Sequence, residues 1–181
     1  DLASQFPLLR RPAQTKTIAL LLITANRGLC GGFNANLIKE ARARIAEWEA
    51  KGINVEMHVV GKKGIGFFKY LGKNIASQHT DITDKPSAAD AARLVDGLMT
   101  RFASGELDAV YVTATKFKSA LTAPPGTDAI LPVTPPSGGA ASRDFILAPS
   151  GAEILEALLP AYVRNAVYRA LAEAEAGFQL G

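Results

Sequence analysis

The chain contains 181 residues, of which 48% are hydrophobic and 20% charged, a composition typical of a folded globular protein and not of a disordered one. Its net charge of +3 comes from dispersed residues, which argues against the concentrated basic face that nucleic-acid binding uses. One cysteine excludes an internal disulfide, two histidines leave little material for a zinc site, and no apolar run approaches the roughly 20 residues of a membrane-spanning helix. We therefore expect no cofactor, no metal, no nucleic acid and no direct membrane insertion.

The first sixteen residues predict an extended lead-in segment, because Pro7 and Pro12 oppose a helix. The first core strand is expected immediately after this segment. A domain that opens in this way is expected to be a piece of a longer chain.

A strand, a glycine-rich turn and a helix come next. Residues 18–23 form a continuous apolar run, which predicts a strand buried on both faces of a parallel sheet. Residues 24–34 are polar and glycine-rich, and the apolar residues after them recur at helical spacing. Either Asn34 or Asn36 is expected to cap this helix. The turn is the main candidate site, because ligands and partners tend to meet open α/β sheets at the carboxyl ends of strands.

The following stretch continues the alternation of strands and helices. A second strand is predicted over residues 53–60, which completes a strand-helix-strand unit with two parallel strands. A short helix is expected after it, with an apolar stripe of Ile65, Phe68 and Leu71. A short strand is expected near Ile75.

The clearest helix is predicted over residues 87–102, opened by a capping box of Ser87 and Asp90. A third long strand is predicted from residue 108 to 121. Residues 124–126 are then predicted to turn the chain, and residues 128–133 are predicted to return as the antiparallel partner of that strand.

The last quarter of the chain predicts a long helix after a flexible connector at residues 134–142 and a short extended segment at residues 144–148. A full capping box at residues 150–153 is expected to open the helix, and Pro160 is expected to bend it. Residues 162–175 continue past what the sheet needs to cover, which predicts a contact with another helix or subunit. The expected apolar face comprises Ile154, Leu155, Leu158, Leu159, Tyr162, Val163, Ala166 and Ala170.

Two short features could carry chemistry. Cys30 near a helix start could be a nucleophile, but no pattern ties a histidine to it as a base. Residues 61–66 follow a strand and contain glycines and lysines, but they match neither the dinucleotide-binding nor the phosphate-loop spacing. His58, predicted on a strand, and His79, predicted in a loop, are interpreted as hydrogen-bonded structural residues. The alternative that stays open is a stand-alone Rossmann-like nucleotide-binding domain or enzyme that uses the turn at residues 27–34.

Two separated motifs resemble one protein family. Residues 23–34 (ITANRGLCGGFN) resemble the signature turn of the gamma subunit of rotary F-type ATP synthases. Residues 154–171, which include LLPAYV and VYRAL, resemble the start of the long C-terminal helix of the same subunit. Shorter matches at FPLL, KFKSAL and residues 144–149 fall in the same order, so the likeness spans essentially the whole chain.

The resemblance implies an α/β, Rossmann-like fold: a mostly parallel sheet of about five strands with helices on both faces, plus the start of a long C-terminal stalk helix. It divides the chain into a lead-in at residues 1–16, a globular domain at 17–149, the start of the stalk helix at 150–176, and a stretch at 177–181 that departs from the family pattern. The family's N-terminal helix is missing from this sequence, so we expect an excised or truncated globular domain.

The resemblance also implies a function. A gamma subunit is a non-catalytic rotor that couples ion flow through a membrane ring to ATP synthesis or hydrolysis, and it takes no small-molecule substrate. The implied partners are the alpha, beta and epsilon subunits and the membrane c-ring. The implied location is the cytoplasmic face of a bacterial plasma membrane, or the matrix or stromal face of an organelle membrane, through the complex.

The family places the glycine-rich turn against the lower ends of the beta subunits. The implied contact residues are Arg27, Gly28, Cys30, Gly31 and Gly32, and Arg27 is expected to meet acidic side chains there. Ala25 and Asn26 stand where the family commonly has a Ser-Asp pair, which removes one negative charge beside Arg27.

A second implied contact lies at the foot of the stalk, near the epsilon subunit and the polar loops of the c-ring. Its residues are Phe145, Ile146, Leu147, Ala148 and Pro149. Ala148 replaces an acidic residue of the family, which is expected to weaken a charge-based contact with the ring.

Overall fold

The computed structural model describes residues 2–27, 32–119, 122–134 and 150–179. In chain order, its elements are α1 (Leu2–Gln5), η1 (Pro7–Leu9), β1 (Thr17–Ile23), α2 (Phe33–Ala50), β2 (Asn54–Val60), α3 (Lys62–Tyr70), β3 (Ser77–His79), α4 (Ala88–Ala103), β4 (Ala109–Thr115), β5 (Pro125–Leu131) and α6 (Gly151–Phe178). The predicted extended segment at residues 144–148 lies outside the described ranges, as does all of the connector except Thr134.

The described strands form one sheet in the order β3-β2-β1-β4-β5. β1 pairs in parallel with β2 and β4, β3 pairs in parallel with β2, and β5 pairs with β4 in antiparallel fashion. This confirms the predicted fold class. β1 lies at the centre, and its residues from Ile18 to Leu22 are completely buried, as the unbroken apolar run requires.

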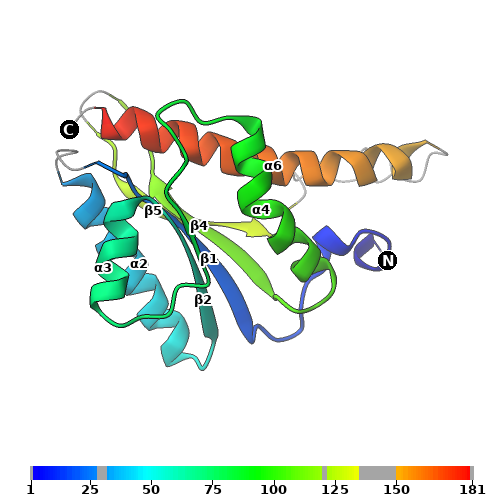
Figure 1. The fold of residues 1–181 in the computed structure, drawn as a ribbon. Coiled ribbons are helices and arrows are strands. Elements are labelled where there is room, and N and C mark those ends of the chain that lie inside the picture. The colour runs from blue at the N-terminus through cyan, green and yellow to red at the C-terminus, as the bar shows by residue number, and fades with distance from the viewer. Residues whose placement is uncertain (1, 28–31, 120–121, 135–149, 180–181) are drawn as a thin grey trace.

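Helices cover both faces of the sheet (Figure 1). Trp48 of α2 packs on Tyr111 of β4, with ring centroids 4.7 Å apart, and α3 lies on the same face. On the opposite face, Arg101 of α4 reaches Glu56 of β2, and α6 runs beside α4 over β4. The core therefore forms two layers of side chains, one on each side of β1.

The ends of two helices test the capping predictions. Ser87 and Asp90 form the predicted capping box, in which the Ser87 hydroxyl accepts from the Asp90 N–H and the Asp90 carboxylate accepts from the Ser87 N–H. The predicted caps of α2 are wrong, because Gly32 is the N-cap residue and Asn34 lies inside the helix. The Asn34 side chain instead accepts a hydrogen bond from the backbone N–H of Ala25, just after β1. Asn36 also lies inside the helix. The Asn34 side chain thus bonds to a residue before the helix and does not cap the helix itself.

The start and the seam of α6 also differ from prediction. Ser150 is the N-cap residue but its side chain makes no capping bond, so the predicted box is wrong. Three residues of the predicted apolar face, Ile154, Leu158 and Tyr162, are exposed, and three others, Leu155, Ala166 and Ala170, are only partly buried. The buried seam lies along Leu159, Val163, Val167, Leu171, Ala174 and Phe178.

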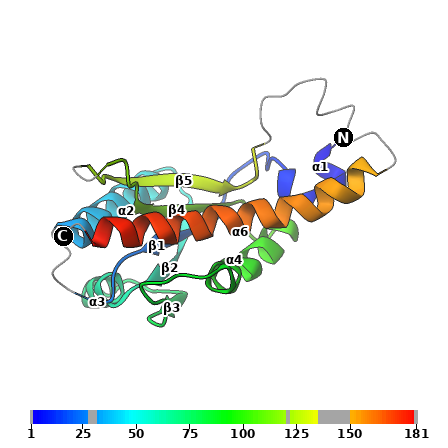
Figure 2. The same cartoon turned by 90° about the horizontal axis from the view of Figure 1, so that it is seen from above.

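The length of α6 explains this shift. Its 28 residues extend about 42 Å, whereas the seven residues of β4 extend about 23 Å. One end must therefore overhang the sheet, and Figure 2 shows that it is the N-terminal end, beside α1. The prediction that residues 162–175 project was wrong, because Val163, Val167 and Leu171 are buried against the domain. Pro160 lies within the continuous helix.

Smaller corrections concern strand ends. β4 ends at Thr115 and does not continue to residue 121. Pro125 belongs to β5 and not to the turn before it. The short strand expected near Ile75 starts two residues later, at Ser77, and Leu71 of the predicted α3 stripe is exposed.

Candidate contact site at the carboxyl edge of the sheet

The first residues of the candidate turn, 24–26, leave β1 at the carboxyl edge of the sheet and are bonded there to the start of α3. The backbone N–H groups of Lys62, Lys63 and Gly64 are three of the unpaired donors that open a helix. They donate to the Asn26 side chain (3.0 Å), the Ala25 carbonyl (3.1 Å) and the Thr24 hydroxyl (2.9 Å). The start of α3 thus holds residues 24–26 and is not available for a phosphate, which removes the phosphate-loop interpretation of residues 61–66.

Gly61 permits this close approach. Its φ is +96°, and a Cβ atom there would lie 2.1 Å from the Thr24 carbonyl oxygen. Only glycine avoids both the strained backbone and the clash.

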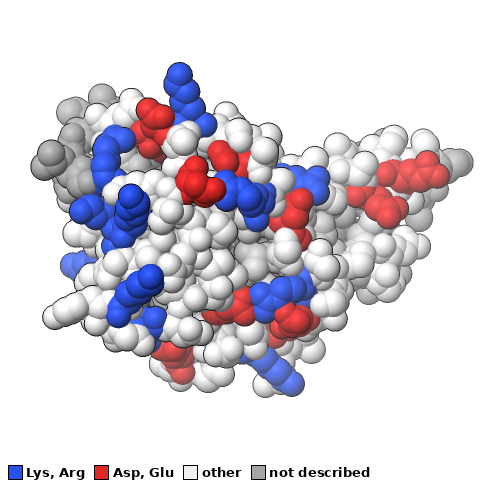
Figure 3. Space-filling view, in the orientation of Figure 1, with Lys and Arg blue, Asp and Glu red and all other residues white. Residues whose placement is uncertain are grey.

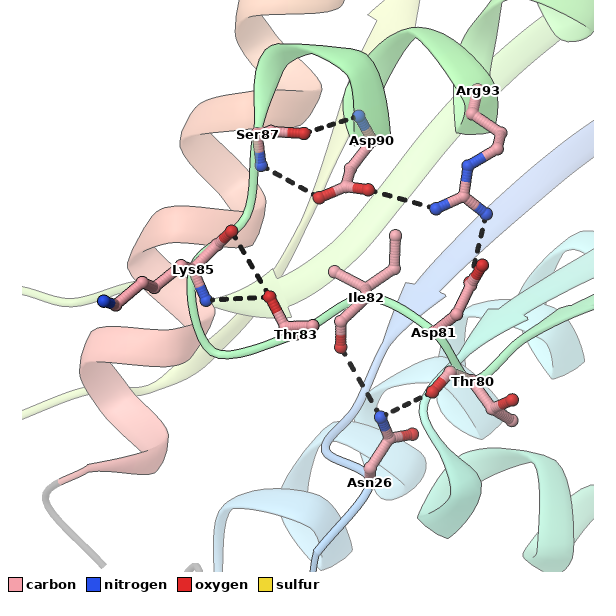
Figure 4. A network of polar contacts seen from close by, with 9 residues as sticks. All are labelled: Asn26, Thr80, Asp81, Ile82, Thr83, Lys85, Ser87, Asp90 and Arg93. Carbon is pink, nitrogen blue, oxygen red and sulfur yellow. Dashed lines mark hydrogen bonds and ion pairs between the residues drawn. The ribbon is translucent and has the colours of Figure 1, made fainter.

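Asn26 connects the turn to the loop between β3 and α4 (Figure 4). Its side-chain amide donates to the Thr80 carbonyl at 2.8 Å and, more weakly, to the Ile82 carbonyl at 3.5 Å. The amide therefore donates on one side and accepts from Lys62 on the other. A carboxylate at this position could make only the accepting bond.

Arg93 holds the same loop against α4. Its guanidinium bonds to Asp81 and to Asp90, each at 3.0 Å (Figure 4). The hydrogen bond from Arg93 lowers the pKa of Asp81, and the backbone N–H of Ser87 is the largest cause that lowers the pKa of Asp90. Both carboxylates are thus kept ionised, so they form ion pairs with Arg93 and do not act as proton donors.

Arg27 follows Asn26 and meets the C-terminal end of α6. Its Nη1 lies 3.5 Å from Oε1 of Glu175, and the side chains are 51% and 17% exposed. Both residues line a cavity of about 140 Å³ together with Thr24, Leu171 and Phe178. The C-terminal end of α6 therefore covers the carboxyl edge of β1.

The same end of α6 packs closely on β4. A Cβ atom on Gly177 would lie 2.6 Å from Cγ2 of Thr115, the last residue of β4, and Phe178 is buried beside it. In open α/β folds the crevice between the carboxyl ends of such strands holds the ligand. Here the protein's own helix occupies it.

A second polar cluster runs along β2 and β3 and reaches this edge at His79. The hydrogen bond from Arg101 is the largest of the causes that lower the pKa of Glu56 to about 2, and Glu56 also bonds to His58 at 2.6 Å. Ser77 lies between His58 (2.6 Å) and His79 (3.0 Å), and burial lowers the pKa of His79. The two histidines thus have structural partners, as predicted, although His79 ends a strand and does not lie in a loop. Among the described residues, no group of three or more His, Cys, Asp or Glu could hold a metal ion.

The predicted contact residues are only partly described. Arg27 and Gly32 lie at the carboxyl edge, and Gly32 has an ordinary φ of −86°. Outside the described residues lie Gly28, Cys30, Gly31 and the predicted foot, Phe145, Ile146, Leu147, Ala148 and Pro149. Asn26 and Glu175 were missed: the sequence flagged Asn26 only as a departure from a Ser-Asp pair, and nothing local connects Glu175 to a turn 148 residues away.

Charge is mixed over the face drawn in Figure 3, where basic and acidic side chains alternate over the globular part. The overhanging end of α6 differs, because it shows acidic side chains alone in this view. No helix of the described residues is long and apolar enough to span a membrane.

These features define a class: a Rossmann-like domain whose ligand crevice is covered by its own long helix, with residues 24–26 held at the carboxyl edge by the start of α3. The chain belongs to the ATP synthase family, because the family model with that description matches residues 1–180. The expected family is thereby confirmed.

Curated relatives agree with this assignment. The chain is 69% identical over 182 aligned residues to the ATP synthase gamma chain of Gemmatimonas aurantiaca, and 37% identical over 173 residues to that of Leptospira biflexa. The alignments cover 99% and 94% of this chain, but only 63% and 60% of the two relatives. The chain thus spans less than two thirds of their length.

Solved structures agree on the fold. The chain resembles a chain in the Tetrahymena thermophila mitochondrial ATP synthase central stalk and c-ring structure, with a TM-score of 0.70 at 19% identity over 97% of this chain and 77% of that one. It also resembles a chain in the rotor of Euglena gracilis mitochondrial ATP synthase, with a TM-score of 0.65 at 17% identity over 99% of this chain and 71% of that one.

Proposed function

We propose that the chain is the globular part of a central-stalk rotor subunit, which couples ion flow through a membrane ring to ATP synthesis or hydrolysis by neighbouring subunits. The observation that carries this proposal is the packing of α6 against the sheet. A seam of buried side chains from Leu159 to Phe178 joins the helix to the sheet, so a torque on one is transmitted to the other. Close packing of this kind resists deformation.

The position of Arg27 fits such a role. Arg27 lies at the carboxyl edge, where we propose that the turn meets acidic side chains of the beta subunits. The predicted foot at residues 145–149 immediately precedes Ser150 in the sequence, and Ser150 is the N-cap of α6, whose N-terminal end overhangs the sheet (Figure 2). We propose that the foot contacts the epsilon subunit and the c-ring, so the domain lies between the ring and the catalytic subunits.

The subunit is proposed to be non-catalytic and to belong to a proton-translocating complex, with the alpha, beta and epsilon subunits and the c-ring as partners. It would reach the cytoplasmic face of a bacterial plasma membrane, or the equivalent organellar face, through that complex. The covered crevice at Gly177 and Phe178 supports this proposal over a free-standing nucleotide-binding enzyme, because α6 packs at the edge where a nucleotide usually binds and leaves only a cavity of about 140 Å³ there.

Two measurements test the proposal. Co-expression of the complete gene with the alpha, beta and epsilon subunits should give a complex that co-purifies and hydrolyses ATP, whereas failure to co-purify would contradict it. Isothermal titration of the 181-residue chain with ATP and ADP should show no stoichiometric binding. Tight binding or turnover by this chain alone would favour the enzyme alternative.

A further inference from the structure

The contact between Arg27 and Glu175 brings an internal carboxylate to the cation that is proposed to meet acidic partners. We propose that Glu175 competes with the partner for Arg27 and so weakens the attraction of this turn for an acidic protein segment. This inference rests on the proposed function of the turn, and it adds a regulating residue on α6.

The two side chains are held differently. Glu175 lies on a helix whose neighbours Leu171, Ala174 and Phe178 are buried, and Gln179 donates to the same Oε1 atom at 3.2 Å. Its side chain is only 17% exposed, so the carboxylate is fixed. Arg27 is half exposed, so it is the member of the pair that an approaching protein segment reaches first.

An approaching carboxylate can reach Arg27, because half of its side chain is exposed. Nη1 is 3.5 Å from Glu175, which is a long contact. An ion pair of this length at a half-exposed site contributes little to stability, so displacing Glu175 from Arg27 costs little. The negative charge of Glu175 nevertheless offsets the positive charge that an approaching acidic segment meets.

The competition can be measured with a labelled acidic peptide that carries about five glutamates in a helix-forming alanine host. Binding to the 181-residue chain is followed by fluorescence anisotropy at low salt, where screening is weak. Glu175→Gln keeps the shape and removes the charge, and we expect it to tighten binding about threefold. Arg27→Gln should weaken binding and abolish the effect of Glu175→Gln in the double variant.

Glu173→Gln is the matched control. Glu173 lies two positions away on α6 but lines a different groove, beside Tyr162 and Ala170. It removes the same charge from the same helix, so it measures the effect of net charge alone. Melting temperatures of all variants verify that each is folded.

The outcomes separate the inference from the proposed function. If Arg27→Gln weakens binding but Glu175→Gln equals Glu173→Gln, the competition is overturned and the contact role of the turn stands. Weaker binding by Glu175→Gln would also overturn it, since the glutamate would then assist the arginine. If Arg27→Gln leaves binding unchanged, both the competition and the proposed contact at this turn are overturned.

Discussion

The two ends of α6 have opposite surroundings. At the C-terminal end Leu171, Ala174 and Phe178 are buried, Gly177 touches Thr115, and Glu175 reaches Arg27. At the N-terminal end the helix runs beyond the sheet with Ile154, Leu158 and Tyr162 exposed. One helix therefore serves as a core element at one end and, among the residues that the structure describes, exposes apolar side chains at the other. The difference shows that hydrophobic spacing identifies a helix face without saying what covers it.

The largest expected effect is at Gly61, where the start of α3 meets Thr24 at the carboxyl edge of the sheet. Gly61→Ala should destabilise the chain by more than about 3 kcal/mol, because the new Cβ would meet the Thr24 carbonyl in a backbone conformation that side chains resist. Gly52→Ala is the control, since Gly52 also has a positive φ, of +78°, but nothing lies within 4 Å of its Cβ position. That change should cost about 1 kcal/mol. Equal midpoints in urea unfolding for the two variants would contradict the predicted clash.

The comparison between the helix ends is tested by one residue type at two positions. Leu171→Ala removes a side chain that is 3% exposed and should cost about 2–4 kcal/mol through the cavity it leaves. Leu158→Ala removes a side chain that is 55% exposed and should change the free energy of unfolding by less than about 0.5 kcal/mol. Thermal unfolding of the 181-residue chain gives both values. Similar losses at the two positions would mean that the overhanging end is packed in solution.

Asn26→Asp tests the amide that joins the turn to the loop before α4. The carboxylate would keep the bond from Lys62 but lose the donor to Thr80 and face that carbonyl with a negative charge. We expect a loss of about 1–2 kcal/mol in urea unfolding. Asn74→Asp, on an exposed loop residue, controls for the added charge. A stability equal to that of this control would show that the bond to Thr80 contributes nothing.

The smallest effect concerns Glu56, away from both ends of α6. Its pKa is lowered to about 2 in the folded protein, so the unfolded chain binds more protons than the folded one between pH 4.5 and 2. Its contribution is therefore present above pH 4.5 and is lost as the pH falls toward 2. We expect about 1 kcal/mol, because the pair with Arg101 is partly exposed to solvent. Glu56→Gln should remove this part of the acid dependence, and an unchanged pH profile would contradict the assignment.

Local patterns predicted what depends on neighbours in sequence. The buried run of β1, the spacing in α4 and the box of Ser87 and Asp90 are set within a few residues, so the structure confirms them. Asn34 does not cap α2, because its side chain accepts a hydrogen bond from the backbone N–H of Ala25 instead. The covered face of α6 could not be chosen from the sequence either, since Leu158 and Leu159 are chemically identical, yet Leu158 is exposed and Leu159 is buried.

The candidate site shows the same limit more strongly. The glycine-rich turn and Arg27 were found from the motif, but the carboxylate beside Arg27 comes from a helix 148 residues later. That pairing depends on how far α6 extends across the sheet. The spacing of apolar residues in the sequence does not show how far a helix extends across a sheet.

The bonds between the start of α3 and residues 24–26 also bear on kinetics. The first N–H groups of a helix usually exchange their hydrogen with water quickly, because they lack intrahelical partners. Lys62, Lys63 and Gly64 instead donate to the chain leaving β1, so their exchange requires α3 and that segment to open together. Residues 24–26 are thus ordered before any partner arrives. A partner that docks beside them loses less affinity to the ordering of the chain than it would on a loose loop.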